Sequence, residues 1–347
     1  MSNLSICIPS KRKLIDSKNS IESALHYINN SKNTEFHISD NSEDPAKKEY
    51  FDAIVNPNIH YKDSKGADAP LNWRNAISSA SGDFIGILND DDLLIKIDPT
   101  TSLDSSELVN CIGFRPNIAV WEKEKGIVRQ TSFEIVGETA LQRVQKYFQI
   151  NQGNNNTIYS FMRKDILKDI HYLNFEANPT GGWYNDWAMV LGYVSSGNIF
   201  TDHSSLYIYD NHNWAGTSQE ITARIESLFT GCGLIKRSII FLPLFNAIDS
   251  FIFIGRKSTP ISRQEALDAG IFALTLYLKS FIQSFQKNPD VFTEIEKNTI
   301  RILISSIGLR EILNAVLEVI NAHAPEATDK YRYFYTTALG CEWGYFI

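Results

Sequence analysis

The first 100 residues alternate short apolar segments with stretches of helical periodicity, and this alternation restricts the fold more than any other feature of the chain. Segments 4–9, 35–39, 54–61 and 84–88 have the length and apolar character of strands. Between them, residues 15–28 and 70–81 carry apolar residues at helical spacing. Strands that alternate with helices predict βαβ units and a mainly parallel sheet, so we expect an α/β fold.

Polar residues follow three of these predicted strands directly. They are Pro9-Ser10, Asp40-Asn41-Ser42 and the run 89–92, Asn-Asp-Asp-Asp. In open α/β sheets, ligands bind outside the carboxyl ends of the strands. The three polar turns therefore predict a ligand site at one edge of the sheet.

The run of three carboxylates, Asp90, Asp91 and Asp92, follows the most apolar of the predicted strands. One interpretation is a polar turn with solvated side chains, because Asp is common in turns. However, three adjacent carboxylates next to a buried strand repel one another unless a positive charge compensates them. Hard divalent cations such as Mg²⁺ and Mn²⁺ prefer oxygen ligands and complete their shells with substrate phosphates. We therefore favour a metal and nucleotide site.

Four other polar residues each allow a functional and a structural interpretation. Asp40 could accept a hydrogen bond from a ligand or cap a helix. Arg74, on a predicted helix, could bind phosphate or lie on the surface. Asp186 follows a Gly-Gly turn near the start of an amphipathic helix, where it could act as a general base or stabilise the helix N-terminus. His212 could bind a metal or fill a polar pocket.

The sequence changes character after about residue 216. Segments 221–254, 263–286 and 290–322 are long, helix-periodic and poor in turn residues, which predicts a helical C-terminal region. Within it, the apolar stretch 238–255 is interrupted by Pro243, Asn246 and Asp249. A membrane-spanning helix needs about 20 mostly apolar residues with few or no charges. A buried helix pair, or a helix on a membrane surface, is the favoured interpretation of this stretch.

Charge and cysteine content exclude some classes of function. The net charge of the 347 residues is −7, and Lys and Arg form no cluster. Binding to a nucleic-acid backbone needs such a cluster, so we expect no nucleic-acid partner. The four cysteines are far apart and form no CxxC pair, which predicts free thiols in a reducing cytosol. We accordingly expect a cytoplasmic protein.

Five segments, taken in order, resemble glycosyltransferase family 2, the nucleotide-sugar transferases with the GT-A fold. They are LSICIPSKRK, EFHISDNSED, WRNAISSASGDFIGILNDDDLL, GGWYNDWAMVLGYVSSG and SLYIYDNHN. The resemblance covers roughly residues 1–214 and implies a Rossmann-like GT-A catalytic domain over 1–216. Its nucleotide-sugar half would be residues 1–100 and its acceptor half residues 101–216. The helical region 217–347 lies outside the resemblance.

The resemblance implies a role for each matching residue. Pro9, Ser10, Arg12 and Asp40 would bind the nucleotide, Arg74 the diphosphate and Asp90 the ribose. Asp92 would hold the metal, with Asp90, Asp91 and His212 assisting, and Asp186 would be the catalytic base. Two residues depart from the family pattern: Asn89 stands where many members have the first Asp, and Asn185 where they have Glu.

The resemblance implies a metal-dependent, inverting glycosyltransferase that uses Mn²⁺ or Mg²⁺. The donor would be a nucleoside-diphosphate sugar, with UDP as the expected nucleotide. The acceptor would be a saccharide or a lipid-linked saccharide, as in bacterial surface polysaccharide or glycoconjugate synthesis. The C-terminal helices could add a peripheral contact with the inner face of the cell membrane or form a homo-oligomer. The alternatives are a nucleotidyl- or phosphoryltransferase and a non-catalytic binding or scaffold protein of the same fold.

Overall fold

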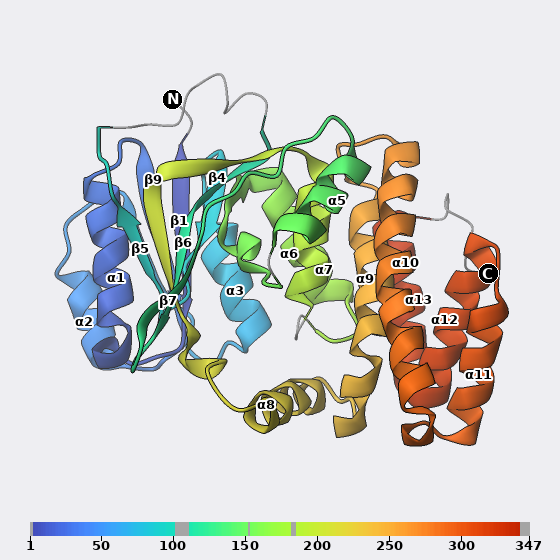
Figure 1. Cartoon of the computed structure of the whole chain (residues 1–347). Coiled ribbons are helices and arrows are strands. Elements are labelled where there is room, and N and C mark those ends of the chain that lie inside the picture. Colours follow the sequence, from blue (N-terminus) through green and yellow to red (C-terminus); the bar gives the residue numbers. More distant parts are fainter. Residues whose placement is uncertain (1–2, 101–110, 152, 182–184, 341–347) are drawn as a thin grey trace. The chain divides into compact units, whose positions relative to one another are not determined.

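The computed structural model describes residues 3–100, 111–151, 153–181 and 185–340, which form two compact units (Figure 1). The first unit comprises residues 1–136, 150–168 and 198–216, and the second comprises 137–149, 169–197 and 217–347. The sequence predicts one boundary, at residue 216, between two continuous domains. In the structure each unit consists of three segments that alternate along the chain. Segments 137–149 and 169–197 therefore belong with the C-terminal helices.

A mixed sheet of nine strands organises the first unit. The strand order is β3-β2-β1-β4-β8-β6-β9-β5, and β7 pairs with β6. The pairs β1–β2, β1–β4, β2–β3 and β6–β9 are parallel, which confirms the predicted α/β class. The strands are β1 (Leu4–Ser10), β2 (Thr34–Asp40), β3 (Ile59–Asp63), β4 (Phe84–Ile87), β5 (Leu93–Lys96), β6 (Gly113–Glu122), β7 (Gly126–Thr131), β8 (Phe161–Arg163) and β9 (Ile199–Asp210).

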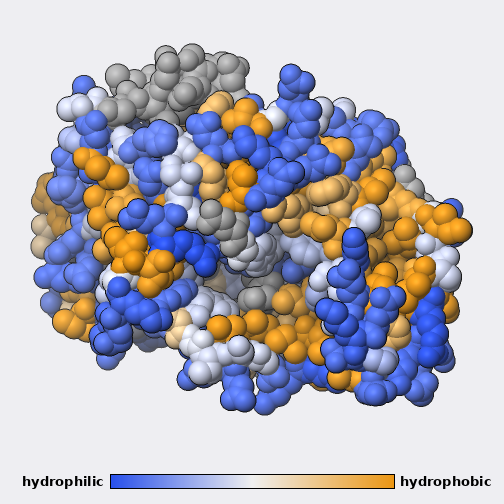
Figure 2. Space-filling model, viewed as in Figure 1, coloured by the Kyte–Doolittle hydropathy of each residue, from blue (hydrophilic) through white to orange (hydrophobic). Residues whose placement is uncertain are grey.

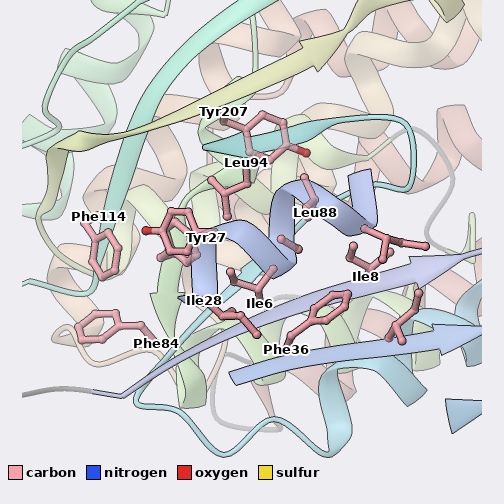
Figure 3. Packing of buried hydrophobic residues seen from close by; sticks show 14 of the residues in the cluster. Ile6, Ile8, Tyr27, Ile28, Phe36, Phe84, Leu88, Leu94, Phe114 and Tyr207 are labelled. Carbon is pink, nitrogen blue, oxygen red and sulfur yellow. The ribbon is translucent and has the colours of Figure 1, made fainter. Parts of the chain in front are cut away.

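Helices cover both faces of the parallel part of this sheet. The helices α1 (Leu14–Asn29) and α2 (Pro45–Asp52) lie on one side and α3 (Ala69–Ser78) on the other (Figure 1). Figure 3 shows Tyr27 and Ile28 of α1 against Ile6 of β1 and Phe36 of β2, in the core of this unit. Successive strand residues point to opposite faces, so the intervening residues of β1 and β2 face α3.

Close packing in this core depends on a glycine in the central strand β4. A Cβ atom at Gly86 would lie 2.3 Å from the ring of Phe161 on β8, which is too close for any side chain. The ring of Phe161 in turn stacks on Phe114 of β6, with centroids 5.0 Å apart. The short segment Phe84–Ile87 is therefore buried along its whole length, and it delivers the acidic run directly to the edge of the sheet.

Several predicted boundaries differ from the structure. The strand expected at 54–61 begins only at Ile59, because residues 54–58 form a loop whose last turn is closed by the Ile59 N–H and the Asn56 carbonyl (3.1 Å). Residues 199–210 form one long strand, β9, which the sequence pattern did not delimit. The helix α6 (Lys164–Ala177) was not expected.

The second unit is helical, as predicted for the C-terminal region. Three of its helices begin with capping boxes, in which a Ser or Thr and a Glu three residues later satisfy the first backbone N–H groups. These boxes are Thr217–Glu220, Ser262–Glu265 and Thr293–Glu296. Its helices are α5 (Ala140–Ile150), α7 (Asp186–Ser196), α8 (Ser218–Gly231), α9 (Leu242–Gly255), α10 (Arg263–Lys287), α11 (Glu294–Ser305), α12 (Leu309–His323) and α13 (Pro325–Leu339), together with the C-terminal part of α6.

The apolar stretch near residue 240 forms the centre of this unit. Lys236–Gly255 is long and apolar enough to cross a membrane by composition, but 78% of its apolar window is buried inside the protein. The helix α9 packs against α7 and α10. This burial agrees with the interpretation of the stretch as core helices. Figure 2 shows hydrophobic and hydrophilic residues mixed over the face that it displays.

Asp249, a carboxylate in the middle of α9, makes the stability of this unit depend on pH. The side chain is 1% exposed, and burial raises its pKa to about 7, which the hydrogen bond from Asn178 opposes only in part. The folded state keeps this proton up to about pH 7, whereas the unfolded chain loses it near the ordinary value of 3.8. The contribution of the protonated Asp249 side chain to the free energy of unfolding is therefore complete below pH 3.8, and it is lost as the pH rises towards 7.

We expect Asp249→Asn to stabilise the protein at pH 8 by about 1–3 kcal/mol, because the amide carries no charge to bury. Urea unfolding between pH 4 and 8 measures this difference. The exposed Asp268 of α10 provides the control, and Asp268→Asn should leave the pH dependence unchanged. If Asp249→Asn and the wild type lose stability in parallel over this range, then Asp249 is charged in the folded state.

Candidate functional site

The carboxyl ends of β1 and β4 meet, as predicted, because the two strands are parallel neighbours. Asp90, which follows β4, accepts three hydrogen bonds at Oδ2 from the turn after β1. The donors are the Ser10 hydroxyl (2.9 Å) and the backbone N–H groups of Lys11 (2.8 Å) and Arg12 (2.9 Å). Asp90 thus fixes the conformation of this turn and holds Ser10 and Arg12 beside the acidic run.

Arg12 provides a positive charge for two of the three carboxylates. Its Nη2 donates to Asp91 Oδ2 at 2.6 Å, and its Nε lies 3.3 Å from Asp90 Oδ1. Burial raises the pKa of Asp91, and the charge of Arg12 opposes that rise only in part. Since the Arg12 side chain is 36% exposed, solvent weakens this pair, and an incoming ligand can reach both partners.

Asp92 is placed differently from its two neighbours. It has no exposed surface, and its carboxylate accepts hydrogen bonds from Tyr207 Oη (2.6 Å), the Asp210 N–H (2.7 Å) and Asn89 Nδ2 (2.9 Å). Burial raises its pKa to about 7, although these hydrogen bonds lower it. The oxygens of Asp92 therefore tie the acidic run to β9, whereas Asp90 and Asp91 line the cavity described below. The metal role expected for Asp92 stays a prediction.

Asp40 is also committed to contacts within the protein. It is 3% exposed and accepts hydrogen bonds from Tyr61 Oη (3.0 Å) and the Ser42 N–H (3.0 Å), and Lys47 Nζ lies 3.3 Å from its Oδ1. Lys47, a fully buried residue of α2, also donates to Ser10 Oγ at 2.7 Å and to the Arg12 carbonyl. Asp40 and Lys47 therefore position the turn after β1.

A cavity of about 300 Å³ opens next to these residues, within the first unit. Its volume is at the lower end of the range found for ligand pockets. Acidic and aromatic side chains dominate its walls, with the rings of Tyr159 and Tyr209 stacked 5.4 Å apart. The lining residues are Pro9, Trp73, Asn89, Asp90, Asp91, Tyr159, Tyr209, Asp210, Asn213 and Trp214.

This cavity includes some of the residues expected from the sequence and several that were not. Pro9, Asp90 and Asp91 line it. Arg74 is half-buried on α3, next to the lining residue Trp73. The aromatic walls and Asp210 were not predicted, because they come from segments distant in sequence. The sequence did offer one signal for Tyr209 and Asp210: they lie at the end of a predicted strand, just before the candidate ligand His212.

His212 lies beside Asp210 at the end of β9. Its Nδ1 is 3.1 Å from Asp210 Oδ2, and its side chain is 40% exposed. It also interacts electrostatically with Asp91. Two carboxylates and an imidazole are suitable ligands for Mn²⁺, and carboxylates suit Mg²⁺. The donor types of these residues therefore suit a divalent cation that completes its shell with phosphate oxygens.

Asp186 belongs to the second unit, where it is the first residue of α7. It is partly buried, its Oδ1 accepts the Trp187 N–H at 3.1 Å, and its charge adds to the burial that raises the pKa of Tyr277. Residues 182–184 of the preceding turn lie outside the described part. The neighbouring Asn185 is buried and donates to Asn174. The assignment of Asp186 as the base stays a prediction.

Comparison with known proteins gives matches at the level of structure. No protein-family model and no curated protein matches the sequence. The crystal structure of S. aureus TarS residues 1–349 matches with a TM-score of 0.51 at 13% identity, over 99% of this chain and 91% of that one. The same protein with UDP-GlcNAc matches with a TM-score of 0.45 at 12% identity, over 99% and 92%.

The first TarS match shows the fold alone, since a sequence identity of 13% does not extend to function. The chain has a TarS-like GT-A fold, with a mixed, mainly parallel α/β sheet followed by C-terminal helices. The resemblance noted in the sequence ended near residue 214, whereas the structural match extends through the helical region.

Proposed function

We propose that this protein is a glycosyltransferase that moves a sugar from a nucleoside-diphosphate donor, with a UDP-sugar as the expected donor, to an acceptor hydroxyl. The cavity beside Asp90 and Asp91 carries this proposal. It combines partly buried carboxylates, an arginine that contacts them and aromatic walls, at the carboxyl edge of a GT-A sheet. The carboxylates suit a cation that binds the diphosphate, the arginine suits the negative charge of the diphosphate, and the aromatic rings suit the base.

In the proposed reaction, Asp186 takes the proton from the acceptor hydroxyl while the hydroxyl oxygen attacks the anomeric carbon. The new C–O bond forms as the bond from this carbon to the phosphate oxygen breaks, and the nucleoside diphosphate leaves with both electrons of that bond. A single displacement inverts the anomeric configuration. Arg12 and Arg74 would bind the diphosphate during this step.

A divalent cation, held by Asp91 with Asp210 and His212 and completed by the diphosphate, would supply charge neutralisation for the leaving group. Mn²⁺ and Mg²⁺ are the proposed ions. The acceptor is proposed to be a saccharide or a lipid-linked saccharide, which would place the protein at the cytoplasmic face of a membrane.

Donor binding can be tested with a panel of nucleotide sugars. A ligand that binds only the folded state raises the melting temperature in proportion to the logarithm of its concentration. We expect at least one UDP-sugar to do so in the presence of Mn²⁺. A panel in which no nucleotide or nucleotide sugar changes the melting temperature would contradict the proposal.

We expect removal of divalent cations to reduce sugar transfer at least a hundredfold. Three carboxylates, Asp90, Asp91 and Asp210, line the cavity and would repel a diphosphate that arrived without its cation. Transfer is measured after exhaustive chelation and again after excess Mn²⁺ or Mg²⁺ is added, which should restore it. Transfer that persists undiminished in chelator would exclude the cation from the reaction.

A further inference from the structure

A second group of metal-ligand side chains lies at the opposite end of the strands. Glu35 and His37 alternate on β2, so they share a face, and His60 of β3 is the register partner of His37. Glu35 is five residues before Asp40, which places it about 16 Å from the edge that carries the cavity. Nothing in the proposed transfer reaction uses these three residues.

The three side chains already converge. Glu35 Oε1 lies 2.9 Å from His37 Nε2, and Glu35 Oε2 lies 3.8 Å from His60 Nε2. One ligand atom from each residue can be chosen so that all three lie within 4.8 Å of one another, which holds for no other such group among the described residues. Ligand atoms around a tetrahedral zinc ion are roughly 3.3 Å apart, given bond lengths of about 2.0–2.2 Å. Small side-chain movements would therefore complete the geometry.

His37 has an unsatisfied nitrogen that faces this group. The residue is 3% exposed, and its buried Nε2 makes no hydrogen bond of good geometry within the described residues, although it lies 2.9 Å from Glu35 Oε1. A buried polar atom without a partner is costly. The lone pair of a neutral imidazole would be satisfied by a metal ion at this position.

Neighbouring residues hold His37 and Glu35 in place, as outer-shell groups do in metal sites. Ser79 Oγ lies 3.1 Å from His37 Nδ1, which orients the ring with Nε2 towards Glu35. Glu35 accepts hydrogen bonds from Ser5 Oγ (2.5 Å) and from the Ser81 N–H (2.6 Å) and Oγ (2.9 Å). Lys168 is a nearby cation, but its ammonium group donates hydrogen bonds to the carbonyls of Ser78 and Ala80 and none to Glu35 among the described contacts.

We propose that Glu35, His37 and His60 bind a divalent transition-metal ion, and that zinc is the ion their chemistry favours. Two imidazoles and one carboxylate suit zinc, and they leave a fourth position for water on the side of the half-exposed His60. The strand β3 is at the edge of the sheet, so the ion would fasten this edge strand to β2.

Calorimetric titration of the metal-free full chain with Zn²⁺ alone tests the site. We expect one equivalent of Zn²⁺ to bind to the wild type. We expect His60→Ala to weaken that binding by about tenfold to a hundredfold. His60 is exposed, so its removal does not endanger folding. His26→Ala removes an exposed histidine of α1 and is the matched control, which should bind like the wild type.

The variant His212→Ala distinguishes this site from that of the proposed catalytic cation. We expect it to bind one equivalent of Zn²⁺ with the wild-type affinity, in contrast to His60→Ala. Bound Co²⁺ should give the visible absorption of a four-coordinate site in the wild type and the His26 variant, and lose it in the His60 variant. Equal Zn²⁺ affinity in the wild type and His60→Ala, or the absence of a stoichiometric Zn²⁺ site in the wild type, would overturn the proposal.

Discussion

Asp186→Asn is expected to lower the rate of sugar transfer by about 10²–10⁴-fold while donor affinity stays at the wild-type value. The amide cannot take the proton of the acceptor hydroxyl. It preserves the shape of the side chain and suits the start of a helix, so the fold should persist. Initial rates of transfer and a separate titration with the donor measure the two effects.

Asp165→Asn is the matched control, because Asp165 is also a carboxylate in the first turn of a helix, α6, and is exposed. It should leave transfer unchanged. If Asp186 acts only by stabilising the start of α7, the Asn variant will show a lower melting temperature with a proportionate loss of activity. Transfer by Asp186→Asn at close to the wild-type rate would remove Asp186 from the reaction altogether.

Asp91→Asn is expected to weaken the binding of a UDP-sugar with Mn²⁺ by about tenfold to a hundredfold, or about 1.4–2.7 kcal/mol. The change removes a proposed cation ligand and the partner that Arg12 contacts at 2.6 Å. Calorimetric titration at constant Mn²⁺ measures the affinity. The Mn²⁺ concentration that half-restores donor binding should rise in parallel.

Asp63→Asn is the control for this variant. Asp63 ends β3 at the same edge of the sheet, is exposed and does not line the cavity. It therefore changes the net charge equally without touching the site. Wild-type affinity in Asp91→Asn, or an equal loss in Asp63→Asn, would contradict a specific role for Asp91.

The meeting of Ser10, Arg12 and the acidic run could be predicted from the sequence, because parallel strands place their carboxyl ends at one edge. Which of the three carboxylates line the cavity could not be predicted. Hydrogen bonds from Tyr207, 115 residues away, and from the backbone N–H of Asp210 hold the Asp92 carboxylate in the protein interior. Periodicity identifies β9 as a strand but does not give its neighbours in the sheet.

Buried ion pairs were also beyond sequence reasoning. Lys47 is one of two adjacent lysines on a short helix, and only the packing of α2 shows that it is buried while Lys48 is exposed. The same limit applies to Glu35, His37 and His60, since the register of β2 and β3 brings the two histidines together. The interleaving of 137–149 and 169–197 with the C-terminal helices likewise depends on tertiary packing.

The central claim is that the protein breaks the bond between the sugar and the diphosphate. Phosphorus NMR of a nucleotide-sugar panel, incubated with the protein, Mn²⁺ and saccharide acceptors, tests this most directly. The account predicts that at least one donor is converted to free nucleoside diphosphate while its sugar appears in a new glycoside. Release of pyrophosphate with a new nucleotide adduct, or an unchanged panel, would contradict it.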